Sequence, residues 1–179
     1  GDPARRMGNE YLFAQLAQEN IETFKQYKFR KILVTCPHCL NSLGQDYREF
    51  GTSYTVVHHS QLLAELLAAG RVPLDLAKGI EGLVTFHDPC YLARYSDTVE
   101  PPREVLVRLG AKARPFLPHR IDDGYGLAEE TLQRCIDELR PRLVITVDCG
   151  AAATAALRHP QGRRRLRRVP DATAPLGLG

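Results

Sequence analysis

The chain lacks any long hydrophobic run. No stretch approaches the roughly 18–20 consecutive apolar residues that a membrane-spanning helix needs, and no basic-then-apolar leader opens the sequence. We therefore expect no membrane span. The first residues, without an initiator methionine, look like the interior of a longer chain. We expect a cytoplasmic protein or the cytoplasmic part of a larger one.

Cysteine is scarce as well. Five cysteines among 179 residues are too few for a disulfide scaffold, and their number is odd. Four of them follow short apolar runs, at Cys36, Cys39, Cys90 and Cys149, whereas Cys135 lies within an expected helix. This placement favours metal binding or redox chemistry in a reducing compartment.

The excess of positive charge is small and local. The net charge is +3, but residues 158–179 carry six arginines and one aspartate, which leaves the preceding residues slightly acidic. The arginine run 163–168 suits an acidic surface, a lipid or a nucleic acid, but a solvated, disordered basic tail over 159–179 is the expectation. Nothing else in the sequence supports specific nucleic-acid recognition. With 44% apolar residues, the chain has an ordinary globular composition.

Short apolar strands alternate with helical patterns throughout the chain. The expected strands are 30–35, 54–58, 83–86, 112–117 and 142–149, and the expected helices are 9–28, 40–50, 61–69, 101–109, 127–139 and 151–157. This alternation predicts an α/β fold with mainly parallel strands, whose functional groups lie at the carboxyl ends of the strands. The strand–cysteine–helix units at 31–36 and 142–149 look alike, so we expect two related Rossmann-like halves, 1–75 and 76–158, produced by an internal duplication.

Cys36 and Cys39 form the most informative motif. A short strand ends directly in Cys-Pro-His-Cys, and a helical pattern follows. The positive end of a helix stabilises thiolate, the form that binds metal or attacks sulfur, and Pro37 suits the first helical turn. The motif predicts a metal or redox site, although two inert cysteines beside a tight turn are the alternative.

A second motif, His-Asp-Pro-Cys, ends at Cys90. Its proline forces the chain to turn after the strand, which exposes Cys90 at the same sheet edge as the first cysteine pair. The histidines at strand ends are expected to be hydrogen-bonded structural residues rather than ligands: His58, His59 and His87.

Cysteines from separate strand ends can converge on one metal site. Thiolate-rich sets suit both an iron–sulfur cluster and zinc. Zinc needs four ligands, which Cys36, Cys39 and Cys90 could supply together with either His87 or Cys149. The residue types alone leave the choice between the two metals open.

The chain resembles the cysteine-rich, or CCG, family. The resemblance is carried by GDPARRMGNEYLF at 1–13, TCPHCLNSL at 35–43, VVHH at 56–59 and HDPCYLAR at 87–94, and it extends from Gly1 to about Leu106. The family includes the B-type subunit of heterodisulfide reductase and the iron–sulfur subunits of glycolate, lactate and glycerol-3-phosphate oxidation. Its members have two repeats, each with a lone cysteine, a Cys-Cys-Gly box and a Cys-x-x-Cys.

This resemblance implies an iron–sulfur electron-transfer subunit, or a fragment of one, in an oxidoreductase complex. The implied cofactor is a [4Fe–4S] cluster, which is non-cubane in the heterodisulfide reductases. The implied partners are other redox subunits, such as a flavoprotein or a ferredoxin-like protein, and electrons would pass to or from a disulfide, a quinone or such a partner. A peripheral complex at the inner face of the membrane is compatible with this function.

By their position in the matching motifs, the resemblance implies that Cys36 and Cys39 are the Cys-x-x-Cys of the first repeat. Cys90 matches the lone cysteine of the second repeat, and Cys149 stands near its last motif. The first Cys-Cys-Gly box would lie just upstream of the first residue. The second box is absent from 118–126, and no second thiol follows Cys149. We therefore expect a degenerate second cluster site and, within this chain, an incomplete first one.

Two other functions stay open on the sequence. A thiol–disulfide oxidoreductase would use Cys36 and Cys39 as its dithiol, although it would not need the further strand-end cysteines. A non-catalytic interaction domain, with remnant cysteines or bound zinc, is the second alternative.

Overall fold

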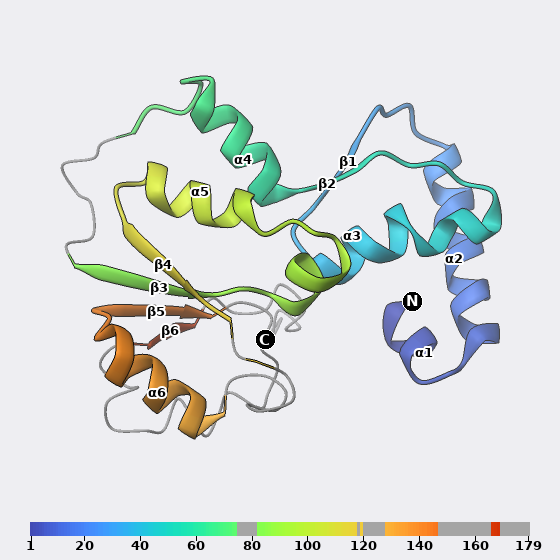
Figure 1. Ribbon diagram of the computed structural model, residues 1–179. Coiled ribbons are helices and arrows are strands. Elements are labelled where there is room, and N and C mark those ends of the chain that lie inside the picture. Colours follow the sequence, from blue (N-terminus) through green and yellow to red (C-terminus); the bar gives the residue numbers. More distant parts are fainter. Residues whose placement is uncertain (75–81, 118, 120–127, 147–165, 169–179) are drawn as a thin grey trace, which may run out of the picture. The chain divides into compact units, whose positions relative to one another are not determined.

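The computed structural model describes residues 1–74, 82–117, 119, 128–146 and 166–168. The chain divides into two compact units, Gly1–Leu62 and Leu63–Gly179. Each unit combines helices with a sheet whose strands pair in parallel (Figure 1). The predicted α/β class with parallel strands is therefore confirmed.

The first unit holds a two-stranded sheet and several helices. Its elements are α1 (Asp2–Arg6), α2 (Glu10–Lys25), β1 (Ile32–Val34), α3 (Pro37–Gly44), the 3₁₀ helix η1 (Asp46–Phe50) and β2 (Val56–His58). Helix α4 (His59–Ala68) follows β2 directly, and the division between the units falls within it. Val34 is the parallel partner of His58, so β1 and β2 end at the same edge of their sheet.

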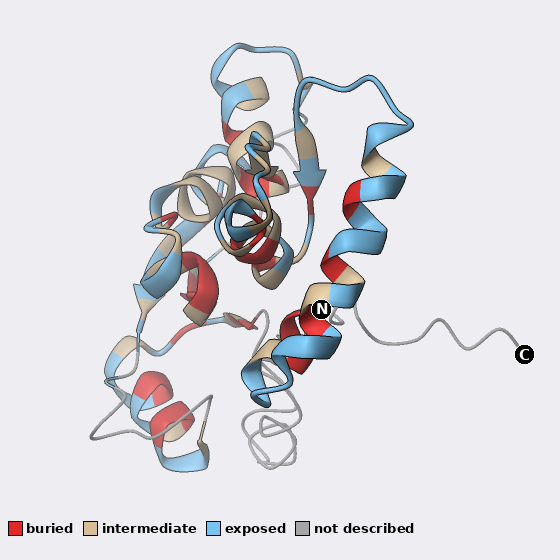
Figure 2. Ribbon diagram, turned by 90° about the vertical axis from the view of Figure 1, so that its right-hand side faces the viewer, coloured by how far each residue is buried: buried red, intermediate tan, exposed pale blue. Residues whose placement is uncertain are grey.

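Helix α2 supplies much of the core of this unit. Asn9 caps the helix, since its side-chain oxygen accepts a hydrogen bond from the Leu12 amide at 3.0 Å. Phe13, Ala17 and Ile21 follow at helical spacing and are buried together with Tyr47. Figure 2 shows these buried positions recurring along α2 between exposed turns.

The second unit contains a four-stranded parallel sheet in the order β4-β3-β5-β6. Its elements are β3 (Leu83–His87), the π-helix η3 (Tyr91–Tyr95), α5 (Glu100–Arg108), β4 (Lys112–Phe116), α6 (Glu129–Leu139), β5 (Leu143–Thr146) and β6 (Leu166–Arg168). Figure 1 shows α5 and α6 on opposite sides of this sheet. The strand β6 lies within the segment that the sequence assigns to a basic tail.

Strand β3 is the buried centre of that sheet. Residues 84–87 are all buried, as expected of a strand with parallel neighbours on both sides and helices above and below. Leu132 and Ile136 on α6 pack with Val144 on β5 in one buried cluster. The carboxyl end of β3 therefore emerges from the best-packed part of the unit.

The single helix expected over 40–50 is wrong. The structure has two helices there, because α3 begins three residues earlier, at Pro37, and ends at Gly44. Gln45, with φ −119° and ψ −61°, follows the last residue of α3, and the chain continues as the 3₁₀ helix η1. Asp46 stabilises this break, since its carboxylate accepts hydrogen bonds from the side chains of Asn41 and Ser42.

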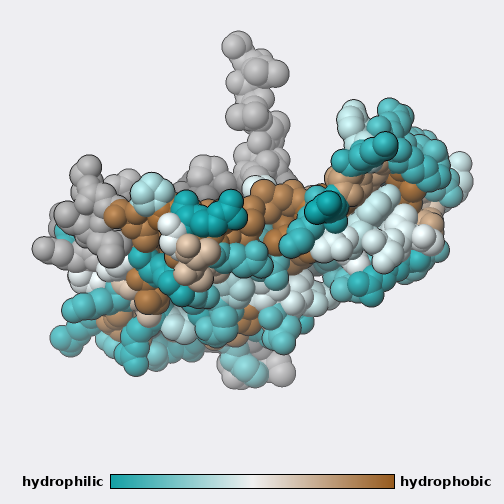
Figure 3. Space-filling view, turned by 90° about the horizontal axis from the view of Figure 1, so that it is seen from above, coloured by the Kyte–Doolittle hydropathy of each residue, from teal (hydrophilic) through white to brown (hydrophobic). Residues whose placement is uncertain are grey.

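The described surface mixes polar and apolar residues. Figure 3 shows hydrophobic patches between hydrophilic residues on the face that it draws. Large exposed side chains include Met7, Tyr11 and Tyr27. Among the described helices, none combines the length and the apolar character needed to span a membrane.

The core assignment can be tested at Phe13. Its ring is 1% exposed and lies near the rings of Tyr47 and Phe50, at centroid distances of 6.1 and 6.0 Å. We expect Phe13→Ala to lower the free energy of unfolding by about 3–5 kcal/mol, because it opens a cavity in the core. Denaturant unfolding measures this, with Leu12→Ala on the exposed side of α2 as the control. A similar loss in both variants would contradict the packing described.

Candidate functional site

Cys36 lies at the junction of β1 and α3. It is the N-cap of α3, with extended backbone angles of φ −101° and ψ 125°, and Pro37 occupies the first helical turn. The Leu40 amide donates to the Cys36 carbonyl at 3.1 Å, which closes that turn. Cys36 is half-buried and Cys39 is exposed, and both are free thiols. The strand-to-helix junction predicted from the sequence is therefore present.

The two thiols differ in protonation. The Cys39 thiol donates a hydrogen bond to the Cys36 sulfur, and together with the backbone amides of Cys39 and His38 it lowers the pKa of Cys36 to about 6, against the opposing effect of burial. The same hydrogen bond, reinforced by burial, raises the pKa of Cys39 well above its usual range. The shared hydrogen bond therefore favours the thiolate at Cys36 over a thiolate at Cys39.

A buried carboxylate from α1 holds the helix that carries the cysteine pair. Asp2 Oδ2 lies 2.8 Å from His38 Nδ1, and Asp2 Oδ1 accepts a hydrogen bond from Arg6 Nε at 3.1 Å. Arg6 also lies 3.7 Å from the carboxylate of Asp46, which follows α3. Asp2 is buried, and its charge-assisted contacts with the partly exposed His38 and Arg6 link α3 to α1.

His58 joins the ends of the two strands at the same edge. Its Nε2 lies 3.1 Å from the carbonyl oxygen of Thr35, the residue before Cys36, and its Nδ1 lies 2.8 Å from Ser60 Oγ. A carbonyl only accepts, so Nε2 carries the proton and Nδ1 accepts from Ser60. Burial, reinforced by the neighbouring His59, lowers the pKa of His58 to about 4. His58 is therefore the neutral structural histidine that the sequence predicts.

Cys90 follows the buried strand of the second unit. The preceding Asp88 is 1% exposed, and its carboxylate accepts two hydrogen bonds from Arg103 on α5, from Nε at 3.1 Å and from Nη2 at 2.6 Å. Cys90 is half-buried and caps the start of the π-helix η3. His87 is buried, and its burial lowers its pKa. The turn predicted after β3 is therefore held by a bidentate ion pair.

The predicted site residues fall into three groups. The structure brings Cys36 and Cys39 together in the first unit and places Cys90 at the end of β3 in the second. Cys149 lies outside the described residues. Cys135 is fully buried in α6, and burial raises its pKa to about 11, which leaves it an inert core residue. Over the described part of the chain, no three His, Cys, Asp or Glu side chains gather as a metal-binding group.

Sequence reasoning missed the two carboxylates that support the cysteine-bearing turns. Asp2 reaches His38 across 36 positions of the chain, and Asp88 reaches Arg103 across 15. No local pattern marks such distant partners. The one available signal was the acidic residue directly before Pro89, which stands where a buried strand leaves the sheet.

The comparison with protein families supports the resemblance noted for the N-terminal segment. Residues 1–44 match the family model described as CCG, cysteine-rich domain. This range contains α1, α2, β1 and α3, and with them both Cys36 and Cys39. The resemblance expected from the sequence is confirmed for this segment.

Several curated relatives are named as oxidoreductases or reductases. The chain is 39% identical over 112 residues to the EtfAB:quinone oxidoreductase of Syntrophomonas wolfei. It is 42% identical over 106 residues to the probable iron-sulfur-binding oxidoreductase FadF of Bacillus subtilis. It is 34% identical over 95 residues to one subunit of the dihydromethanophenazine:CoB–CoM heterodisulfide reductase of Methanosarcina acetivorans. No solved structure matches the chain.

These similarities cover part of each protein. The matched regions are 63, 59 and 51% of this chain but 15, 15 and 23% of the three relatives, in the order given. The chain thus spans less than a quarter of the length of the relatives it matches.

The role of the buried ion pair can be tested at Arg103. Arg103→Ala leaves the Asp88 carboxylate, whose side chain is 2% exposed, without its charged partner. We expect the free energy of unfolding to fall by about 3–5 kcal/mol. Arg108→Ala is the matched control on α5, because its 2.7 Å pair with Glu104 is exposed and contributes about 0–1 kcal/mol. Equal effects in denaturant unfolding would contradict a supporting role for the pair.

The titration of His58 gives a pH prediction. Its folded pKa, about 4, lies below the ordinary value of 6.5, so the unfolded chain takes up a proton first as the pH falls. The stability contributed by neutral His58 is complete above pH 6.5 and is lost as the pH falls toward 4. We expect His58→Gln, which does not titrate, to flatten the dependence of unfolding free energy on pH in this window. An unchanged slope would show that His58 does not titrate as described.

Proposed function

We propose, on the premise that residues 1–44 are a cysteine-rich domain of the CCG type, that the chain is all or part of an iron–sulfur electron-transfer subunit. The complex would be an oxidoreductase of the heterodisulfide reductase type. The observation that carries this proposal is the Cys36–Cys39 pair at the β1–α3 junction, where hydrogen bonds lower the pKa of Cys36. The redox names of the relatives support it.

The donor set of the first unit fits such a cluster in part. Cys36 and Cys39 are one helical turn apart and free of disulfide bonds, and paired thiolates suit iron–sulfur clusters. They would supply two ligands. The remaining ligands would come from Cys90, from Cys149 or from residues outside this chain. When bound, an iron–sulfur cluster takes up and releases single electrons.

The surrounding residues position the two sulfurs and adjust their charge. The Cys39 thiol and the amides at the start of α3 donate to Cys36 and lower its pKa. Asp2 fixes His38 between the two cysteines, and His58 fixes the carbonyl before Cys36. This support is needed because a thiolate ligand set works only when its geometry is held before the metal arrives.

The proposed cluster type and the proposed repeats rest on the family resemblance. The cluster is of the [4Fe–4S] type, which is non-cubane in the heterodisulfide reductases. The chain consists of two related Rossmann-like repeats, 1–75 and 76–158, of which the second is degenerate. In support, β1 leads into Cys36 and α3, and β3 leads into Cys90 and the helix η3. Residues 159–179 form a basic extension.

The partners follow from the proposed electron transfer. Electrons would pass between this chain and another redox subunit, a flavoprotein or a ferredoxin-like protein. One relative is named a probable membrane-anchored ferredoxin, which supports work at a membrane. By resemblance, we place the chain in the cytoplasm, in a complex at the inner face of that membrane.

A thiol–disulfide oxidoreductase is the second candidate. The specific feature in its favour is the lowered pKa of Cys36 beside the raised pKa of Cys39, because disulfide exchange uses one thiolate and one thiol. Such an enzyme would reduce a disulfide substrate without any metal and would leave Cys36 and Cys39 oxidised to a disulfide.

Iron and sulfide content tests the leading proposal. After anaerobic reconstitution of the chain with iron and sulfide, we expect bound iron below four atoms per chain, because only part of the ligand set lies together. Cys36→Ser and Cys39→Ser should each remove most of that iron, as measured by metal and sulfide analysis and by visible absorption.

Cys135→Ser is the matched control, since it also removes one thiol but from the buried face of α6. Equal iron loss in Cys135→Ser and Cys36→Ser would reject the assignment of the pair. Iron retained by both Cys36→Ser and Cys39→Ser, together with disulfide reduction by the metal-free chain, would favour the second candidate.

A further inference from the structure

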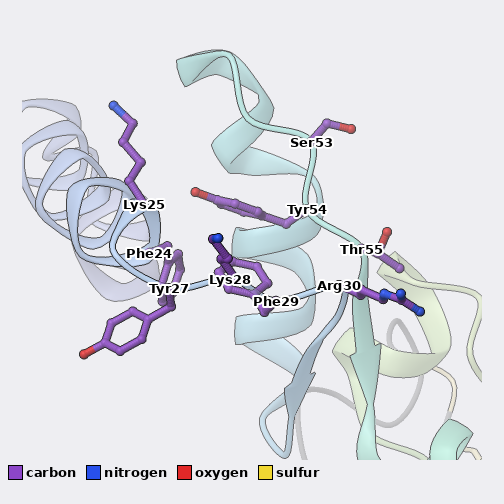
Figure 4. Close-up of a pocket in the computed structure, with 9 residues that line it drawn as sticks. All are labelled: Phe24, Lys25, Tyr27, Lys28, Phe29, Arg30, Ser53, Tyr54 and Thr55. Atoms are coloured by element: carbon purple, nitrogen blue, oxygen red, sulfur yellow. The ribbon is translucent and has the colours of Figure 1, made fainter.

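A cavity of about 600 Å³ opens in the first unit, away from the cysteine pair. Its lining comes from residues 24, 25 and 27–30, at the end of α2 and before β1, and from residues 53–55, before β2 (Figure 4). Because β1 and β2 are parallel, the cavity lies at their amino ends, whereas Cys36 follows the carboxyl end of β1. The cavity is therefore distinct from the candidate metal site.

Aromatic rings form one wall of this cavity. Phe24, Phe29 and Tyr54 contact one another, with ring centroids 5.6 to 6.0 Å apart. Figure 4 shows Tyr54 directed toward the end of α2, with Phe24 and Phe29 beside it. Phe29 is 41% exposed although its ring belongs to this cluster. The wall thus offers aromatic surface to a flat group that enters from solvent.

The rest of the lining consists of positively charged and hydroxyl-bearing side chains. Lys25 is paired with Glu22 at 2.7 Å, whereas Lys28 and Arg30 have no ion pair among the described residues. The hydroxyls of Ser53, Tyr54 and Thr55 likewise have no hydrogen-bond partner there. No carboxylate belongs to the lining.

We propose that this cavity binds a planar aromatic anion of the nucleoside monophosphate class. The base would lie against the aromatic wall, and the phosphate would pair with Lys28 or, on the other side of Phe29, with Arg30, since Figure 4 draws these two side chains in different directions. The free hydroxyls would bond to the ribose or the phosphate. The volume is in the range of small-molecule sites. A simple phosphate would leave the aromatic wall unused, and an uncharged ring would leave the two cations unused.

The first step of the test locates the binding. The ¹⁵N-labelled chain is titrated with adenosine 5′-monophosphate, and amide shifts are followed by NMR. We expect saturable shifts at 24–30 and 53–55, with weak affinity because the cavity is open. Adenosine and inorganic phosphate, titrated separately, should each bind at least tenfold more weakly, since each uses half of the lining. Added salt should weaken the binding of the nucleotide.

Variants make the test specific. Lys28→Ala combined with Arg30→Ala should weaken nucleotide binding at least tenfold, whereas Arg48→Ala, an exposed cation of η1 outside the lining, should leave it unchanged. Cys36→Ser should also leave it unchanged, so the result is independent of the proposed cluster. The proposal is overturned by the absence of saturable shifts at millimolar nucleotide, by equal binding of inorganic phosphate, or by unaltered binding in the double variant.

Discussion

The parallel pairing of β1 with β2 is the constraint on which the cysteine site depends. It brings the end of β1 beside His58, whose Nε2–H donates to the Thr35 carbonyl. That bond fixes the chain at the last residue before Cys36. The turn into α3 then has little freedom, because Pro37 restricts the backbone at the next position. Cys36 therefore lies on a segment whose backbone is held on both sides.

Each unit uses a buried carboxylate to hold the segment next to its cysteine. In the first unit Asp2 holds His38 between the two thiols, and in the second Asp88, two residues before Cys90, is held by Arg103. Neither carboxylate would stay buried without its partners, since an unpaired buried charge is strongly destabilising. The buried polar contacts beside the cysteines are therefore structural supports, as the apolar cores are.

The sequence predicts the local features well and the distant contacts poorly. Strand β1 and the end of η1 depend on residues that are close in sequence, the apolar run before Cys36 and the glycine after η1. Both could therefore be predicted directly. The break at Gln45 could not, because it depends on Asp46 receiving hydrogen bonds from α3. The same holds for the ion pair at Asp88. Apolar spacing identified the buried face of α2, but not the cavity at its end, which arises from the meeting of two loops.

The ion pair between Asp88 and Arg103 also closes a ring in the chain, and Cys90 lies inside it. Fifteen positions separate the two residues, and within them the Ser96 amide bonds to the Tyr91 carbonyl, five residues back, in the wide turn of η3. In a helix each residue added or removed rotates the later residues by about 100°. One insertion or deletion between Glu100 and Arg103 would turn Arg103 away from Asp88, because Glu100 and Arg103 both lie in α5. Residues 96–99 lie outside any helix, so an inserted residue there can be absorbed without turning α5. The number of residues is therefore a structural property of the helical part of this ring.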